Sequence, residues 1–402
     1  MQRIAIIGGG AAGLACAIVS GQAGASVRIF EMDERVARRI LVTGNGRCNF
    51  SNANMGPEVY RNVAFVAKVY GAVTPADVRD FFADLGLLWV TEPDGRMLPR
   101  TGRASTVVDV LRARCALLGV EECCGTGVRQ LVPPPEAGGP WTLVLADGRF
   151  ERAEAVVVTT GGQDPFGFLP EGIPTTLFVP VLGPLKTDTS LIRGLDGIRV
   201  PCRVTLACHE RSDIAEEGEL LFRKYGVSGI CVFNLSRHID DDCILRIDLF
   251  PDLDWEGLQA LLEARSAALL ARDGGATVGD MLRGMVLPQL WNAVCAFAST
   301  RTDSPLAGYT SNEFETLAVS LKSWPLEVRG IAEPGQCQVH RGGVEVSAVS
   351  DELESRRYPG LVFAGEIVDV DGPCGGSNLH WAWASGMLAG AAAARYAGRE
   401  AL

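Results

Sequence analysis

The chain has 402 residues, of which 47% are hydrophobic and 21% charged, a composition that excludes a long disordered tract and allows two or three self-supporting domains. Its 37 basic and 48 acidic side chains give a net charge of −11, so no nucleic acid is expected as a partner. The 12 cysteines include no CxxC pair and the 4 histidines no HxH or HExxH spacing, so we expect mostly reduced cysteines and no metal site.

No apolar run approaches the length of a membrane helix, and Met1 to Gly10 lead from a short strand into a glycine loop without a cleavage site. We therefore expect a cytoplasmic protein that uses no membrane and acts on a small molecule. The sequence does not indicate the oligomeric state.

The N-terminal segment has the pattern of a βαβ unit. Residues 3–7 form a short apolar strand, residues 8–13 a glycine turn, residues 11–23 a helix of small residues, and residues 26–31 a second strand. This order places the start of the chain in a parallel sheet.

The glycine turn has GxGxxG spacing, which is typical of dinucleotide binding. Gly8 permits the tight turn, Gly10 lets a phosphate approach the backbone, and Gly13 lets the helix pack against the strand. Glu31 ends the second strand and can accept both ribose hydroxyls of an adenosine, which disfavours NADP at this site. The alternative for Glu31 is a solvated carboxylate at a strand end.

Residues 43–49, with the sequence TGNGRCN, combine two glycines, two amides and a guanidinium. Backbone N–H groups and a forked donor of this kind suit a phosphate or the carbonyl edge of a flavin, although a surface turn can have the same composition.

The middle of the chain alternates helical and strand patterns. Helical spacing covers residues 75–85 and 106–118, and the pair Asp147-Gly148 predicts a hairpin between strands at 141–146 and 150–159. From about residue 185 the pattern is of short strands, at 199–208, 220–222 and 243–249, followed by a helical region at 254–300. A capping box at Thr310 and Glu313 opens another helix, and a strand returns at 325–330.

The C-terminal region contains a second cofactor-type segment. An apolar strand ends in Gly365-Glu366, and after Asp371 the residues GGSN at 375–378 lead into a small-residue helix. The acid offers an acceptor for ribityl hydroxyls, and the helix N-terminus places a positive dipole near the flavin N1 and C2 carbonyl, where reduction adds negative charge. Together with the first motif this favours FAD over NAD, although another βα unit of an open sheet would show part of the pattern.

Three segments, ILVTGNGRCNFSN at 40–52, GELLFRKYGVSG at 218–229 and LVFAGEIVDVDGPCGGSNLHWAWASGMLAG at 361–390, resemble the BaiN-like family of bacterial FAD-dependent oxidoreductases. The resemblance covers most of the chain and implies an α/β fold with a Rossmann-type FAD-binding domain from residues 1–185 and 335–402. It further implies a β-rich, barrel-like middle domain from residues 186–250 and 305–334, with a helical insertion at 251–304. One departure is the stretch from Gln163 to Pro184, rich in proline, phenylalanine and glycine, which predicts a different substrate or partner specificity.

The motifs and the resemblance together predict a set of cofactor-binding residues. At the ADP moiety these are Gly8, Gly10, Ala11, Ala12, Gly13 and Glu31, with Val128 on the adenine side. The loop with Asn45, Gly46, Arg47, Cys48 and Asn49 is expected near the pyrophosphate or the flavin, and Gly365, Glu366, Asn378 and Leu379 at the ribityl chain and isoalloxazine. Arg39, Thr160, Gly161, Asp371 and Gly376 complete the predicted set.

No catalytic side chain is specified by the sequence. His380, Tyr225 and Cys48 are candidates, but each has a packing role as its alternative. We expect hydride transfer to or from a C=C or C–N bond of a small apolar molecule, with NADH or NADPH as a transient donor, because no second GxGxxG unit is present. The alternatives are an amine or alkane-bond oxidase reoxidised by oxygen, and a flavin electron carrier with a protein partner.

Overall fold

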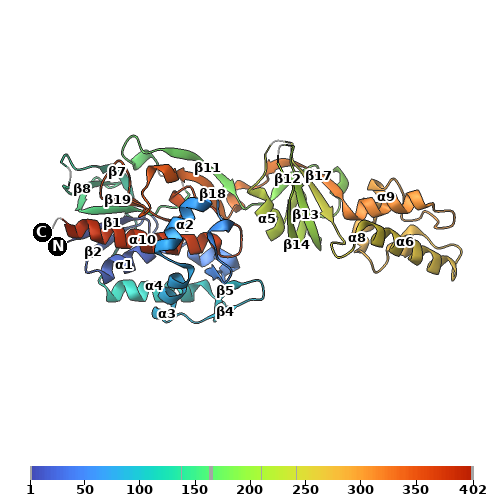
Figure 1. Cartoon of the computed structure of the whole chain (residues 1–402), viewed down its shortest axis with the longest axis horizontal. Coiled ribbons are helices and arrows are strands. Elements are labelled where there is room, and N and C mark those ends of the chain that lie inside the picture. The colour runs from blue at the N-terminus through green and yellow to red at the C-terminus, as the bar shows by residue number, and fades with distance from the viewer. Residues whose placement is uncertain (1, 137, 163–165, 210, 241, 400–402) are drawn as a thin grey trace. The chain divides into compact units, whose positions relative to one another are not determined.

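In the computed structural model, described for residues 2–136, 138–162, 166–209, 211–240 and 242–399, the chain forms two compact units (Figure 1). Unit 1 contains residues 1–179 and 339–402, and unit 2 contains residues 180–338. Helices at 255–297 belong to unit 2 together with the barrel strands.

Unit 1 is built on a five-stranded parallel sheet with the order β19-β10-β1-β2-β6. These strands are β1 (Arg3–Ile7), β2 (Ser26–Phe30), β6 (Glu121–Cys123), β10 (Ala155–Val158) and β19 (Leu361–Phe363). Val156, Val157 and Val158 are fully buried, as expected for a central parallel strand covered on both faces. The sheet therefore joins the N-terminal and C-terminal parts of the chain, as the fold prediction required.

The helix α1 (Ala11–Gln22) packs against α10 (Ser377–Arg399), and both are drawn in Figure 1 beside the sheet. A side chain at Gly386 would collide with the backbone of Ala12, and one at Gly390 with the backbone of Cys16. The absence of Cβ atoms at these two positions permits the close approach of the helices. The remaining helices of unit 1 are α2 (Val63–Ala72), α3 (Pro75–Asp84) and α4 (Ala104–Leu117).

Three small sheets complete unit 1. They are β3-β5-β4 (Ser51–Asn52, Arg96–Pro99, Trp89–Thr91), β7-β8-β9 (Val128–Val132, Trp141–Leu145, Phe150–Ala153) and β11-β18 (Thr175–Val181, Val339–Val344). The predicted hairpin is confirmed, because β8 and β9 pair across Asp147-Gly148. The single strand expected at 150–159 is wrong: the chain changes sheets at Glu154, which bonds to Arg3, and only β10 joins the parallel sheet.

Unit 2 is a closed barrel with the order β12-β15-β14-β13-β16-β17. Its strands are β12 (Leu185–Thr187), β13 (Arg199–Ala207), β14 (Ile214–Arg223), β15 (Gly226–Ser228), β16 (Ile244–Asp248) and β17 (Trp324–Ile331). The helices of this unit are α5 (Ile230–Ser236), α6 (Trp255–Leu270), α7 (Val278–Leu282), α8 (Pro288–Phe297) and α9 (Ser311–Lys322). The Thr310–Glu313 capping box is present at the start of α9.

Buried and exposed side chains alternate along β13, and the buried ones form part of the barrel core. Val200, Cys202, Val204 and Leu206 are buried, whereas the intervening Arg203 is exposed and pairs with Glu217 on β14. This period of two is what a sheet with one buried face requires.

Cys208 and Cys243 form a disulfide between the end of β13 and the start of β16, and the ten other cysteines are free thiols. Within the described ranges, no helix combines the length and hydrophobicity needed to cross a bilayer.

Candidate cofactor and active site

The segments that directly follow four of the five parallel strands of unit 1, at the carboxyl edge of the sheet, carry about half of the predicted cofactor residues. Following the strand order, Glu366 comes after β19, Thr160 after β10, Gly8 after β1 and Glu31 after β2. Ligands of open α/β sheets bind outside this edge. The strand order therefore places Glu31 and Glu366, the predicted acceptors for the ribose and the ribityl chain, along one edge of the sheet, and we call this line the predicted cofactor path.

The turn after β1 has the shape that the glycine spacing predicts. A side chain at Gly13 would collide with the Gly8 carbonyl oxygen, and one at Gly8 with the Thr159 carbonyl. At Gly10, the residue that caps α1, a Cβ atom would lie more than 4 Å from every described residue other than its chain neighbours. This space beside the start of α1, where the first backbone N–H groups of a helix have no intrahelical partner, is compatible with a pyrophosphate.

Glu31 is held by the backbone on both carboxylate oxygens. Its Oε2 accepts the Gly9 N–H at 2.7 Å and its Oε1 the Asp33 N–H at 2.9 Å. The Thr126 N–H donates to the Glu31 carbonyl, which places the start of β7, with Val128, next to this acid. The carboxylate is fixed in one orientation and keeps lone pairs for ribose hydroxyls.

Thr160 supplies an unsatisfied group at the centre of the path. Its Oγ1 is buried and makes no hydrogen bond with the residues that the structure describes. A Cβ atom at the next residue, Gly161, would lie 3.5 Å from Glu366 Oε2 and 3.9 Å from Arg39 Nη1, so these two side chains flank the turn. A buried hydroxyl without a protein partner can donate a hydrogen bond to a ligand. Gln163, the first residue of the divergent stretch, lies outside the described residues.

The segment at 40–49 is a tight left-handed loop. Gly44, Asn45, Gly46 and Cys48 all have positive φ, a conformation that glycine and asparagine adopt most readily. Asn49 Oδ1 accepts the Met97 N–H at 3.1 Å, which fastens the loop to β5.

Two members of this loop do not present their side chains as expected. Cys48 is fully buried, and burial raises the pKa of its thiol to about 11, so a reactive thiolate is excluded there. Arg47 is half-exposed and pairs with Glu92 at 3.0 Å. The Cys48 hypothesis was wrong because glycine turns do not reveal which side chain faces the core.

The C-terminal loop positions the start of α10. Asn378 Oδ1 accepts the Gly372 N–H, and its Nδ2 donates to the Gly372 carbonyl, both at 2.9 Å. Asp371 is 1% exposed and forms a two-point ion pair with Arg341. These side chains shape the loop, so groups that can meet a ligand here are the backbone N–H groups of Gly376 to Leu379 at the helix N-terminus.

His380 lies under this loop as a core residue. It has no exposed surface, its Nδ1 is hydrogen-bonded to Ser51 Oγ at 2.8 Å, and desolvation, with a contribution from Arg79, lowers its pKa to about 3. A side chain covered on all sides by protein and neutral at physiological pH cannot protonate a substrate. The hypothesis that His380 is a catalytic acid is therefore wrong, and His380 is a packing residue of the core, as the alternative had it.

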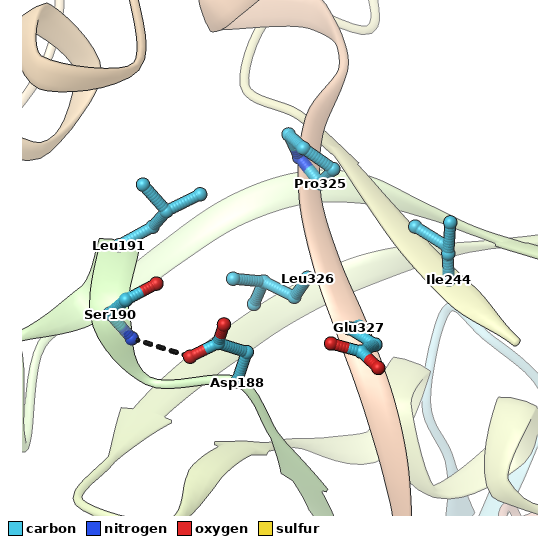
Figure 2. Close-up of a pocket in the computed structure, with 7 residues that line it drawn as sticks. All are labelled: Asp188, Ser190, Leu191, Ile244, Pro325, Leu326 and Glu327. Carbon is cyan, nitrogen blue, oxygen red and sulfur yellow. Dashed lines mark hydrogen bonds between the residues drawn. The ribbon is translucent and has the colours of Figure 1, made fainter. Parts of the chain in front are cut away.

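Tyr225 lies in unit 2, where the Arg223 guanidinium approaches its ring at 5.9 Å. Desolvation raises the pKa of its hydroxyl. The described part of unit 2 also carries a pocket of about 200 Å³ on the barrel wall, lined by Asp188, Ser190, Leu191, Ile244, Pro325, Leu326 and Glu327 (Figure 2). None of these residues belongs to the predicted cofactor set.

Strand β18 contributes residues that the sequence motifs did not indicate. The His340 backbone N–H donates to Glu366 Oε1 at 2.7 Å, and its ring Nδ1 lies 3.2 Å from the same oxygen. Gly342 N–H donates to Asp369, which also pairs with Arg61. Sequence patterns could not find these contacts because β18 lies more than twenty residues before its partners and contains no recognisable motif.

Comparison with protein families matches the HI0933-like protein Rossmann domain over residues 2–392. The chain belongs to this family. Among curated relatives, the 3-dehydro-bile acid delta(4,6)-reductase of Clostridium scindens is 32% identical, over 98% of this chain and 99% of the relative. The ribosomal RNA dihydrouridine synthase of Escherichia coli is 29% identical, over 94% of this chain and 95% of the relative.

Comparison with solved structures finds the 3-ketosteroid-delta4-(5alpha)-dehydrogenase of Rhodococcus jostii, with a TM-score of 0.47 and 14% identity over 98% of this chain and 97% of that one. Another is E. coli quinol fumarate reductase FrdA, with a TM-score of 0.49 and 15% identity over 99% of this chain and 71% of that one.

As an HI0933-like protein, the chain is an FAD-dependent oxidoreductase, and the resemblance to the BaiN-like family is confirmed. The residues at the sheet edge fit FAD: an open cradle at Gly10, a fixed acceptor at Glu31 and an unsatisfied hydroxyl at Thr160. In the described residues no group of three His, Cys, Asp or Glu side chains could hold a metal ion.

Proposed function

We propose that this protein reduces a carbon–carbon double bond conjugated with a carbonyl group in a small, largely apolar substrate, with NADH or NADPH as the electron donor. The observation that carries the proposal is the chemistry shared by its relatives. A 3-dehydro-bile acid delta(4,6)-reductase and a dihydrouridine synthase both saturate a C=C bond conjugated with a carbonyl. The same reaction class is the best supported one for this chain.

The reduced flavin supplies the hydride of such a reaction. The residues of this chain would bind and orient the cofactor: Glu31 would accept ribose hydroxyls, Gly10 would admit the pyrophosphate, and Glu366 would accept ribityl hydroxyls. The N-terminus of α10 would stabilise negative charge that develops on the flavin.

Charge favours a small substrate over RNA. Between Pro180 and Gln338, 15 basic and 22 acidic side chains give unit 2 a net charge of −7. At least eight of those basic side chains form ion pairs within the unit, including Arg199 with Glu219 and Arg203 with Glu217. RNA binding depends on cations that are free to neutralise phosphates. A uridine in RNA is nevertheless a second candidate, because two relatives carry the name ribosomal RNA dihydrouridine synthase.

The nicotinamide donor is proposed from the sequence. A single GxGxxG unit is present, and its acid, Glu31, fits the adenosine of FAD. A nicotinamide nucleotide would therefore bind transiently to reduce the flavin, without a Rossmann site of its own.

The test uses the FAD-loaded protein under anaerobic conditions. NADH and NADPH are mixed separately with the protein, and the loss of flavin absorbance is recorded. The reduced protein is then mixed with a 3-oxo-Δ4 steroid, with its saturated analogue as the matched control, and with uridine-containing RNA. We expect bleaching by a nicotinamide and recovery of absorbance with the unsaturated steroid, accompanied by a product two mass units heavier.

Three results would contradict the proposal. If neither nicotinamide bleaches the flavin while amines or saturated substrates do, the protein is an oxidase or dehydrogenase. If RNA restores the absorbance and the steroid does not, the substrate is a nucleic-acid base. Reoxidation by neither, with rapid electron transfer to a protein acceptor, would identify an electron carrier.

A further inference from the structure

Reduction of a C=C bond requires a proton as well as a hydride, and the side chains around the C-terminal loop can be compared as donors. His380 and Cys48 are fully buried. Tyr70 is also buried, bonds to the Tyr60 hydroxyl at 2.8 Å, and has its pKa raised by desolvation. These groups are covered by protein and have no path to a substrate.

His340 differs from these groups in exposure and in geometry. Its side chain is 30% exposed, and Nδ1 lies 3.2 Å from Glu366 Oε1. The ring meets Phe178 of β11 edge-on at 6.1 Å, and Gly162 lies so close that a Cβ atom there would be 2.7 Å from Nδ1. Glu366, Phe178 and Gly162 thus limit the position of the ring, and Nε2 makes no hydrogen bond with the residues that the structure describes.

The position of His340 extends the cofactor path by one strand. β18 runs beside the loop that follows β19: Val344 bridges Val368 in parallel, and Gly343 lies against the Ile367 carbonyl. Glu366 is the last acid on the path from Glu31, and His340 stands immediately beyond it. This is the end of the path at which the reactive part of the cofactor would lie.

We propose that His340 is the proton donor of the C=C reduction, held in place by Glu366. The proposal rests on the proposed function. One alkene carbon gains a hydride from the reduced cofactor, with both electrons of the new C–H bond. The other carbon gains the proton from His340 Nε2, while Nδ1–H continues to donate to Glu366. The imidazole is left neutral and regains its proton from water. In total the substrate gains two hydrogens, and the cofactor returns to its oxidised form.

The test compares His340→Gln and His340→Ala with wild type and with His209→Gln, in which an exposed histidine of unit 2 is changed as a matched control. Three quantities are measured for each FAD-loaded protein: the FAD dissociation constant by flavin fluorescence, the rate of reduction by the nicotinamide, and the rate of reoxidation by the unsaturated steroid. We expect the first two to be unchanged and reoxidation to slow by about 100-fold or more in both His340 variants. Added imidazole should partly restore the rate of His340→Ala only.

The outcomes separate three explanations. Reoxidation at the wild-type rate in His340→Gln overturns the proposal. Weaker FAD binding in both His340 variants, without rescue by imidazole, also overturns it, because His340 would then only position Glu366. Failure of the unsaturated steroid to reoxidise wild type contradicts the proposed function itself, before any variant is compared.

Discussion

His380 and Ser51 form a buried hydrogen bond, 2.8 Å between Nδ1 and Oγ, that ties the start of α10 to β3. The other ring nitrogen, Nε2, is buried without a partner among the described residues. Protonation of the neutral ring would place a positive charge in a site that protein covers completely. This desolvation is the main reason why the pKa of His380 falls to about 3.

The lowered pKa of His380 predicts how the free energy of unfolding depends on pH. Below the unfolded pKa of about 6.5, the unfolded chain binds a proton at His380 that the native protein does not, so the free energy of unfolding decreases as the pH falls. Between about pH 7.5 and pH 5 the loss due to this residue should be about 2 kcal/mol. Urea unfolding of wild type and His380→Gln at both pH values measures it.

The glutamine variant keeps a partner for Ser51 but cannot titrate. Wild type should lose more stability than the variant on acidification, and the difference between them isolates His380 from the other titrating groups. Parallel pH dependence in the two proteins would show that the imidazole is protonated in the native state.

Gly10 and Gly13 should respond differently to alanine. A methyl group at Gly10 would lie more than 4 Å from the described residues apart from its chain neighbours, so Gly10→Ala should unfold at the wild-type temperature yet bind FAD at least about 10-fold more weakly. A methyl group at Gly13 collides with Gly8, so Gly13→Ala should lose roughly 3 kcal/mol of stability as well as FAD. Differential scanning fluorimetry and a fluorescence titration with FAD measure the two effects.

Gly71 provides the matched control for these variants. It lies on an exposed face near the end of α2, and a Cβ atom there meets no protein atom within 4 Å. Gly71→Ala should leave FAD affinity unchanged and stabilise the protein by up to about 1 kcal/mol. If Gly10→Ala binds FAD as tightly as wild type, no phosphate of FAD lies against this turn.

Glu31 should contribute to FAD affinity through its two fixed oxygens. Replacement by alanine removes the acceptors for the ribose and frees the N–H groups of Gly9 and Asp33, so FAD should bind about 10- to 100-fold more weakly. Glu34→Ala, at an exposed neighbouring acid, is the control. If the two variants have equal FAD dissociation constants, Glu31 does not contact FAD and is a solvated carboxylate at the strand end.

The N-terminal βαβ unit could be predicted closely because its signals are local. The GxGxxG turn and the apolar strand before it lie within thirteen residues, and the observed β1 and α1 begin at the expected positions, Arg3 and Ala11. The capping box at Thr310 was predictable for the same reason, since both partners lie in one helical turn.

Contacts between distant segments could not be predicted in this way. His340 reaches Glu366 only because β18 returns to the edge of unit 1 after the chain has completed the barrel. Burial was the other source of error: nothing in the sequence around Cys48 and His380 shows that both side chains point into the core. Side-chain direction in an irregular loop depends on packing that a local pattern does not contain.

The Cys208–Cys243 disulfide joins neighbouring strands of the barrel across a sequence separation of 35 residues. In the chain-entropy model a loop of this length stabilises the folded state by roughly 4 kcal/mol, so reduction should lower the unfolding temperature of the protein. Cys208→Ser should unfold at the lower temperature with or without reductant, whereas Cys123→Ser, which changes a free thiol, should behave as wild type. Alkylation of the denatured protein should label ten cysteines before reduction and 12 after it. Labelling of all 12 without reductant would show that the barrel folds with both thiols free.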